Sequence, residues 1–171
     1  MPRNVEIKAR VSDLEGLERR AAAIADSGPS VLEQEDVFFE TARGRLKLRV
    51  FPDDHGELIY YERPDDREPT TCDYTIAKTH DAPGLRELLS LALPVRGVVC
   101  KQRRLYLAGQ TRIHLDRVRN LGDFMELEVV LRPDQTTAEG GKIAHALMHD
   151  LAIGQEQLID RAYIDLIREE S

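Results

Sequence analysis

The chain has 171 residues, of which 42% are hydrophobic and 32% are charged, a composition typical of a folded globular protein and unlike that of a disordered one. Its formal net charge of −7 argues against non-specific nucleic-acid binding, which needs a positive field. No apolar run approaches the roughly 18–20 residues that a membrane span needs, so neither a membrane nor a nucleic acid is expected as a partner.

The N-terminal segment alternates strictly between polar and apolar residues. Residues 4–11 (NVEIKARV) place a charged face opposite an apolar face, which predicts a β-strand. Ser12 and Glu15 have the spacing of a capping box, so we expect a helix to begin there. Its apolar stripe runs over residues 14–25, and Gly28-Pro29 is expected to end it.

The middle of the chain predicts several short strands and one helix. Strands are expected at residues 31–40, 45–50, 57–63 and 72–78. The second of these (RLKLRV) alternates without a fault between basic and apolar residues. Asp81 then has the position of an N-cap, for a helix that stops at Pro94.

The C-terminal part predicts three more strands, a helix and a short final element. The strands are expected at residues 95–107, 110–118 and 124–131. Thr136 and Glu139 form a second capping box, which opens a helix that ends at Gly154, and residues 158–167 can supply one more short strand or helix. Roughly seven or eight hairpin-linked strands with three helices predict an antiparallel α+β protein. Without an internal repeat or linker, we expect one domain over residues 1–171.

The cysteine content and the first residues bear on location. Cys72 and Cys100 are too few for a disulfide framework and have no metal-type spacing, so both are expected to be reduced thiols. No hydrophobic signal region precedes the first strand. We therefore expect a cytoplasmic protein. The sequence does not define its oligomeric state, and a homodimer is left open.

The polar faces of the predicted strands carry acids and bases on different strands. The acids are Glu6, Asp116, Glu126 and Glu128, and the bases are Lys8, Arg10, Lys47, Arg49, Arg63, Lys101, Arg103 and Arg112. If these faces converge inside a closed barrel, the paired carboxylates Glu126 and Glu128 could hold Mg²⁺ or Mn²⁺ together with Glu6. The surplus of basic residues would need an anionic partner, since unpaired buried charge is costly. A polyphosphate with a bound metal ion would satisfy both groups.

The alternative is a sheet whose charged face contacts solvent through cross-strand ion pairs. Periodicity alone does not choose between the two arrangements. The segregation of charge by strand favours the barrel, since Lys47 and Arg49 share one strand whereas Glu126 and Glu128 share another. His114 also alternates with Arg112 and Asp116, but a lone histidine is more often structural than a base.

These residues resemble those of the CYTH family, also called triphosphate tunnel metalloenzymes. The family signature Glu-x-Glu-x-Lys on the first strand is similar to Asn4-x-Glu6-x-Lys8. The family's later motifs are similar to Lys47-x-Arg49, Lys101-x-Arg103, Asp116, Glu126-x-Glu128 and the closing sequence AYIDL at residues 162–166. Each motif is short, but the ordered set covers essentially the whole chain.

The resemblance implies an antiparallel eight-stranded β-barrel, or tunnel, with helices packed outside and a triphosphate and divalent metal bound inside. Carried over by position, the metal-side carboxylates would be Glu6, Glu126 and Glu128, with Asp116 supporting them. The phosphate-binding residues would be Lys8, Lys47, Arg49, Arg63, Lys101, Arg103 and Arg112. Asn4 departs from the signature by replacing a Glu, which removes one negative charge beside the metal. The family's basic residue on the fourth strand would be supplied by Arg63, which follows Glu62.

The resemblance also implies a reaction class. Residues 98–131 look most like proteins grouped with class IV adenylyl cyclases, which convert ATP to cyclic AMP and pyrophosphate. The first alternative is hydrolysis of tripolyphosphate, thiamine triphosphate or a nucleoside triphosphate in the same tunnel. A second alternative is a non-catalytic module that binds polyphosphate or nucleotide, and a third is an α+β domain with a solvated charged face. The sequence identifies no general base.

Overall fold

The computed structural model describes residues 2–62 and 69–170. The strands are β1 (Arg3–Arg10), β2 (Ser27–Phe39), β3 (Arg45–Val50), β4 (Gly56–Glu62), β5 (Thr70–Thr79), β6 (Val95–Ala108), β7 (Thr111–Val118), β8 (Gly122–Val130) and β9 (Leu158–Ile159). The helices are α1 (Leu14–Ile24), α2 (Ala82–Ala92), α3 (Thr137–Asp150) and α4 (Tyr163–Glu170), with a 3₁₀ turn, η1 (Gln155–Gln157), before β9. No helix in these ranges is both long enough and apolar enough to cross a membrane.

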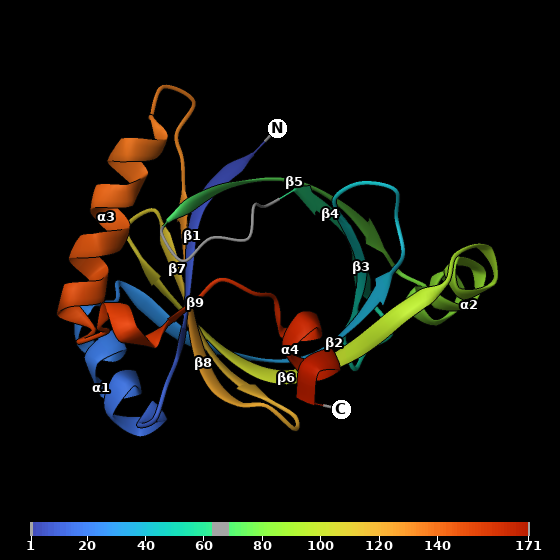
Figure 1. Ribbon diagram of the computed structural model, residues 1–171, viewed down its shortest axis with the longest axis horizontal. Coiled ribbons are helices and arrows are strands. Elements are labelled where there is room, and N and C mark those ends of the chain that lie inside the picture. The colour runs from blue at the N-terminus through green and yellow to red at the C-terminus, as the bar shows by residue number, and fades with distance from the viewer. Residues whose placement is uncertain (1, 63–68, 171) are drawn as a thin grey trace.

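The strands form one closed antiparallel ring, as Figure 1 shows in a view along its opening. Within the described residues the order is β5-β4-β3-β2-β6-β7-β8-β1, and β1 pairs back to β5 to close eight strands into the ring. The short β9 also pairs with β1, at Lys8 and Ala9. The structure confirms the α+β class and the predicted eight-stranded closed ring. Because side chains alternate along every strand, closure gives each strand an inner face and an outer face.

The outer face is apolar and is covered by helices. Figure 1 places α1 and α3 outside the ring on one side and α2 on the other. Leu17 of α1 and Met148 of α3 pack with Ile7 and Leu127 of the strands in the largest hydrophobic cluster. Each fully buried aliphatic side chain of this kind contributes roughly 1.5–3 kcal/mol to folding. Covering the apolar face in this way leaves the polar strand face directed inward.

Helix α4 lies at one end of the ring's interior. In Figure 1 it lies within the outline of the strands, unlike the other helices. Its residues Tyr163 and Ile164 pack against Phe38, Val99 and Phe124, which are inner-face residues of β2, β6 and β8. An apolar cluster therefore fills this end of the lumen, and the charged side chains occupy the rest.

The ends of several elements differ from the predictions. Asp13, and not Ser12, caps α1, because its carboxylate accepts the backbone N–H of Gly16. Gly28-Pro29 does not end α1, because it lies inside β2 and the helix stops earlier, at Ile24. The capping box of Thr136 and Glu139 is confirmed. The tail forms both a short strand and a helix, where one or the other was expected.

Candidate functional site

The inner strand faces enclose a cavity of about 380 Å³ lined by charged side chains. Nine of the predicted site residues line it: Glu6, Lys8, Lys47, Arg49, Lys101, Arg103, Arg112, Glu126 and Glu128. Asp116 is fully buried beside this cavity, and Arg63 lies outside the described residues. Arg10, which shares the polar face of β1, is exposed at the end of the strand. The charged faces thus converge as the barrel hypothesis requires.

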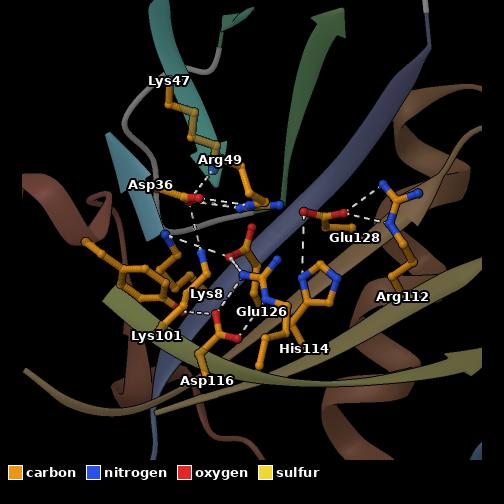
Figure 2. Close-up of polar contacts among 12 residues, drawn as sticks. Lys8, Asp36, Lys47, Arg49, Lys101, Arg112, His114, Asp116, Glu126 and Glu128 are labelled. Atoms are coloured by element: carbon orange, nitrogen blue, oxygen red, sulfur yellow. Dashed lines mark hydrogen bonds and ion pairs between the residues drawn. The ribbon is translucent and has the colours of Figure 1, made fainter. Parts of the chain in front are cut away.

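One side of the cavity, here called the basic half, consists of Asp36, Lys47, Arg49 and Lys101. Asp36 of β2 accepts hydrogen bonds from Arg49 Nε and Nη2 of β3 at 2.8 and 2.9 Å. The same carboxylate accepts Lys47 Nζ at 3.0 Å and Lys101 Nζ of β6 at 3.3 Å (Figure 2). Three cations therefore share one carboxylate, which leaves an excess of positive charge in a buried place.

The pKa values in the basic half reflect this excess. Burial alone would raise the pKa of Asp36, but Arg49, Lys101 and Lys47 outweigh it and hold that pKa well below its usual value. Burial, together with Arg103, lowers the pKa of Lys101 to about 7. Burial and Arg49 likewise lower the pKa of Lys47. A bound anion would favour the charged form of both lysines, so the basic half is electrostatically suited to phosphate.

A fourth cation, Arg103, is held by a separate carboxylate. Asp116 of β7 accepts Arg103 Nε and Nη2 of β6 at 2.7 Å each, in a bidentate pair. The hydroxyl of Tyr163 donates to the same carboxylate at 2.8 Å. Arg103 also lies 3.5 Å from a carboxylate oxygen of Glu126. Both oxygens of Asp116 are thus engaged, and its contacts are those of a residue that orients Arg103.

The opposite side of the cavity, here called the acidic half, consists of Glu6, His114, Glu126 and Glu128. In the register of the strands, Glu128 of β8 lies opposite Glu6 of β1, and Glu126 lies opposite His114 of β7. Figure 2 shows Glu128 between His114 and Arg112, whose guanidinium lies 2.7–2.8 Å from one Glu128 oxygen. Like charges on directly opposed residues are unfavourable, so this half would gain from a bound cation.

His114 has the features of a metal ligand. It is 4% exposed, and its Nδ1 has no hydrogen-bond partner among the described residues. Nδ1 lies 3.8 Å from Glu128 Oε1, which is too long for a hydrogen bond. Two ligands at about 2.0–2.2 Å from a shared ion lie about 3.0–4.4 Å apart, which matches this spacing. Burial and Arg103 lower the pKa of His114 to about 4, so the imidazole is neutral at pH 7 and its lone pair is available.

The donor set therefore fits a divalent ion. Ligand atoms of His114, Glu126 and Glu128 all lie within 4.8 Å of one another. Burial would raise the pKa values of both glutamates, but nearby cations lower them, namely Lys8 and Arg103 for Glu126, and Arg112 and Arg103 for Glu128. Both side chains are therefore carboxylates at neutral pH. Asn4 also lines the cavity, and its buried Oδ1 lacks a hydrogen-bond partner in the described part of the chain. Carboxylate and amide oxygens are ligands that Mg²⁺ and Mn²⁺ accept.

Sequence reasoning missed two residues of this site and set a third aside. Asp36 was overlooked, although Gln34, Asp36 and Phe38 alternate on β2 as the other inner-face residues do. Tyr163 was noted only as part of a motif, because nothing in the sequence shows that α4 enters the ring. His114 was treated as structural, since its proximity to Glu126 and Glu128 depends on the β7–β8 register.

The closed ring with its charged lumen is the architecture of the triphosphate tunnel proteins. A model of the CYTH domain matches residues 2–163, and the chain therefore belongs to the CYTH family. Proteins of this family bind triphosphates and use divalent metal ions. No curated protein matches the chain.

Solved structures share the fold over nearly the whole chain. The PH1012 protein from Pyrococcus horikoshii is 29% identical, covers 95% of this chain and 98% of its own, and has a TM-score of 0.85. A candidate adenylate cyclase from Vibrio parahaemolyticus is 19% identical, with coverages of 96% and 97% and a TM-score of 0.78. HpAC1 from Hippeastrum, a candidate adenylyl cyclase described as having a dominant triphosphatase activity, is 12% identical, with coverages of 100% and 97% and a TM-score of 0.71.

Proposed function

We propose that this protein is a divalent-metal-dependent enzyme that cleaves an organic triphosphate bound in the lumen. The observation that carries the proposal is the separation of charge within one cavity. Three cations share Asp36 on one side. Glu126, Glu128 and His114, whose Nδ1 has no hydrogen-bond partner in the described part of the chain, lie together on the other. A triphosphate with a bound metal ion carries both complementary charges.

The roles of the residues follow from their places in the cavity. The residues that would bind phosphate oxygens are Lys8, Lys47, Arg49, Lys101, Arg103 and Arg112, and Arg63 keeps the same predicted role. The residues that would hold the metal are Glu6, His114, Glu126 and Glu128. Asp116 supports this set by orienting Arg103. Lys8 and Arg103 lie at the boundary between the basic and acidic halves, because they are 4.0 and 3.5 Å from a carboxylate oxygen of Glu126.

The chain's own contribution is positioning and electrostatic stabilisation. When bound, Mg²⁺ or Mn²⁺ would supply positive charge that neutralises phosphate oxygens. The buried guanidinium groups of Arg49 and Arg103 are held by carboxylates in fixed orientations, so little reorganisation is needed as charge develops on the phosphoryl group. Their enclosure in the ring keeps bulk water from screening these interactions.

The apolar part of the lining favours an organic triphosphate over inorganic tripolyphosphate. Leu32, Phe51, Ile76 and Leu105 line the cavity together with the charged residues. Each is partly or largely accessible to solvent, unlike the buried Phe38 and Val99 beside α4. These side chains offer an apolar surface beside the phosphate site for a nucleoside or another organic group.

Two reactions are compatible with this arrangement. In the first, the ribose 3′-oxygen of ATP attacks the α-phosphorus, and pyrophosphate leaves with cyclic AMP as the second product. The resemblance of residues 98–131 to class IV adenylyl cyclases and the fold shared with the Vibrio candidate cyclase support it. In the second, water attacks a terminal phosphorus and orthophosphate leaves. The fold shared with HpAC1 supports this hydrolysis.

Product analysis tests the proposal. The protein is incubated with ATP, thiamine triphosphate or tripolyphosphate, in turn with Mg²⁺, Mn²⁺ and excess EDTA, and the products are resolved by anion-exchange chromatography. Cyclic AMP with pyrophosphate supports the cyclase, and orthophosphate supports the hydrolase. Tight binding without turnover under every metal condition contradicts the enzyme and supports the non-catalytic module. Turnover that persists in EDTA contradicts the assigned metal role.

A further inference from the structure

Tyr163 is the first residue of α4 and reaches into the lumen from the end that this helix occupies. The side chain is 5% exposed and lines the cavity beside the charged residues. It comes from outside the ring of eight strands that supplies the other polar groups of the site. Its hydroxyl and its ring make different contacts. The hydroxyl acts through Asp116 on Arg103, and the ring contacts Lys8 and Lys101, all proposed to bind phosphate.

The hydroxyl acts on the carboxylate that orients Arg103. Tyr163 Oη donates to Asp116 Oδ2 at 2.8 Å, and the same oxygen lies 2.7 Å from Arg103 Nη2. Asp116 is fully buried, so water cannot replace a lost donor without entering the packed interior. The tyrosine hydroxyl therefore helps to fix the plane of the carboxylate and, through it, the direction of the guanidinium.

The ring of Tyr163 faces two lysines, one on β1 and one on β6. Lys8 Nζ lies 4.0 Å from the ring centroid, and Lys101 Nζ lies 5.3 Å from it. Both distances are within the range of cation–π attraction, which is stronger in a desolvated place than at the surface. The aromatic face thus favours the charged ammonium groups in the position from which they line the cavity.

Helix α4 is itself anchored to strands of the ring. Asp165, two residues after Tyr163, pairs with Arg45 of β3 at 2.8 Å and with Arg96 of β6 at 2.6 Å. The ring of Tyr163 also packs at 4.9 Å from that of Phe124 on β8. These contacts fix the helix to three strands and leave the tyrosine little freedom.

We propose that Tyr163 is a positioning residue of the phosphate site, which orients Arg103 through Asp116 and holds the ammonium groups of Lys8 and Lys101 against its ring. The proposal rests on the proposed function, because it assigns these cations to a bound triphosphate. It makes the docked C-terminal helix part of the phosphate site, and not only a filling of the lumen.

The test separates the hydroxyl from the ring. Tyr163→Phe removes only the hydroxyl, and Tyr163→Leu removes both groups. The matched controls are Tyr106→Phe and Tyr106→Leu, because Tyr106 is also buried and also donates to a carboxylate, Glu18 at 3.1 Å, but belongs to the outer-face cluster. Binding of inorganic tripolyphosphate is measured by calorimetry in EDTA, and the melting temperature of each variant is measured in parallel.

We expect graded losses of affinity at residue 163 and none at residue 106. Loss of the hydroxyl should weaken tripolyphosphate binding roughly three- to tenfold, the range of a single hydrogen bond. Loss of the ring as well should weaken it roughly 10- to 50-fold, because two cation–π contacts are added to the loss. The Tyr106 variants should lower the melting temperature but leave the affinity within twofold of wild type. Affinity changes at residue 163 no larger than those at residue 106 would overturn the proposal.

A second measurement keeps the proposal testable without a ligand. The side-chain Nε–H resonance of Arg103, assigned by its absence in Arg103→Lys, reports the geometry of the pair with Asp116. We expect it to shift in Tyr163→Phe and to stay in place in Tyr106→Phe. An unmoved resonance would contradict the positioning role. If wild type binds none of ATP, thiamine triphosphate and tripolyphosphate with Mg²⁺ or Mn²⁺ present, while the resonance shifts as expected, the positioning of Arg103 stands and the proposed function fails.

Discussion

The basic and acidic halves of the lumen reach a balance of charge by opposite means. In the basic half, one carboxylate, Asp36, serves three cations, and burial pushes the pKa values of Lys47 and Lys101 downward. In the acidic half, Glu126 and Glu128 lie beside a neutral imidazole, and their pKa values are lowered by surrounding cations. One half thus lacks negative charge, and the other offers ligands for a positive ion.

This difference supports the proposed function, in which the lumen binds two ligands of opposite charge. A purely structural ion-pair network would place each acid next to one base, since an uncompensated buried charge is unfavourable. Arg103 with Asp116 has that form, whereas Asp36 with its three partners does not. Nδ1 of His114 also departs from it, because it has no hydrogen-bond partner among the residues that the structure describes. The basic half has an excess of positive charge, and the acidic half has ligands for a cation. A bound metal–triphosphate complex would compensate both.

The largest expected effect comes from neutralising the acidic half. Glu126→Gln and Glu128→Gln keep the shape of the side chain but remove the charge that the metal needs. We expect each to lower metal-dependent turnover roughly 10²- to 10³-fold, the range for loss of a key electrostatic group. Steady-state kinetics at saturating Mn²⁺ and Mg²⁺ measure this loss, and circular dichroism confirms the fold.

The matched control for this prediction is Glu33→Gln. Glu33 is an exposed glutamate on β2 that accepts a hydrogen bond from Gln102 at 2.7 Å, away from the acidic half. It should retain turnover within twofold of wild type. Wild-type turnover in both Glu126→Gln and Glu128→Gln would sink the metal assignment.

Removing a cation should have a smaller effect, on binding. Lys47→Ala and Arg103→Ala each delete a charge that lines the cavity; Lys47 is partly buried and Arg103 is buried. A hydrogen bond to a charged group contributes about 1.5–3 kcal/mol, so tripolyphosphate affinity should fall roughly 10- to 100-fold. Calorimetry in EDTA measures the affinity without the metal. Arg117→Ala, an exposed cation paired with Asp123, is the control that should bind normally.

Near-normal tripolyphosphate affinity in both Lys47→Ala and Arg103→Ala would favour a charged network of purely structural purpose. The same result alongside a large loss of turnover in Glu128→Gln would mean that the acidic half alone governs the metal-dependent reaction.

The basic half should also respond to pH, through Lys101. Its pKa is lowered to about 7, so the ammonium form is largely present below pH 7 and is lost as the pH rises. A bound polyphosphate favours the charged form, so its affinity should fall by roughly tenfold between pH 6 and pH 8. Lys101→Arg stays charged throughout this range and should remove the decline. The ratio of the two affinities at each pH cancels the titration of the ligand itself, and a constant ratio would contradict the prediction.

The sequence predicted the ring better than it predicted the contacts inside it. Alternation in segments such as RLKLRV at residues 45–50 depends only on local period, and the strands form where that period predicts them. The resemblance to the CYTH family then supplied closure, which alternation alone left open. The beginning of α1 was misplaced by one residue, because Asp13 and Ser12 are both good capping residues and only the backbone geometry selects between them.

The contacts inside the ring depend on information that is not local. Asp36 faces Lys101 only because β2 and β6 pair in one register. His114 lies beside Glu128 because β7 and β8 also pair in one register. Nothing local in the sequence indicates that this histidine lies next to a glutamate. Tyr163 reaches the site because α4 docks inside the ring, a position that its amphipathic pattern does not reveal. The register between distant strands and the docking of α4 could therefore not be predicted from the sequence.

The smallest effect is expected from a substitution outside both halves of the lumen, Thr136→Ala. It tests whether the stability of the fold can be changed without changing tripolyphosphate binding. Thr136 caps α3 on the outer face of the ring, where its side chain accepts the backbone N–H of Glu139. Thr136→Ala leaves that donor without its cap and should lower the free energy of unfolding by about 1 kcal/mol. Urea denaturation measures this change. Tripolyphosphate affinity should stay at the wild-type value because, among the described residues, the side chain of Thr136 bonds to Glu139 and to no residue of the lumen. A parallel loss of affinity would mean that the two halves are positioned by the global stability of the ring, and that the losses expected at Lys47 and Arg103 do not report direct contacts with phosphate.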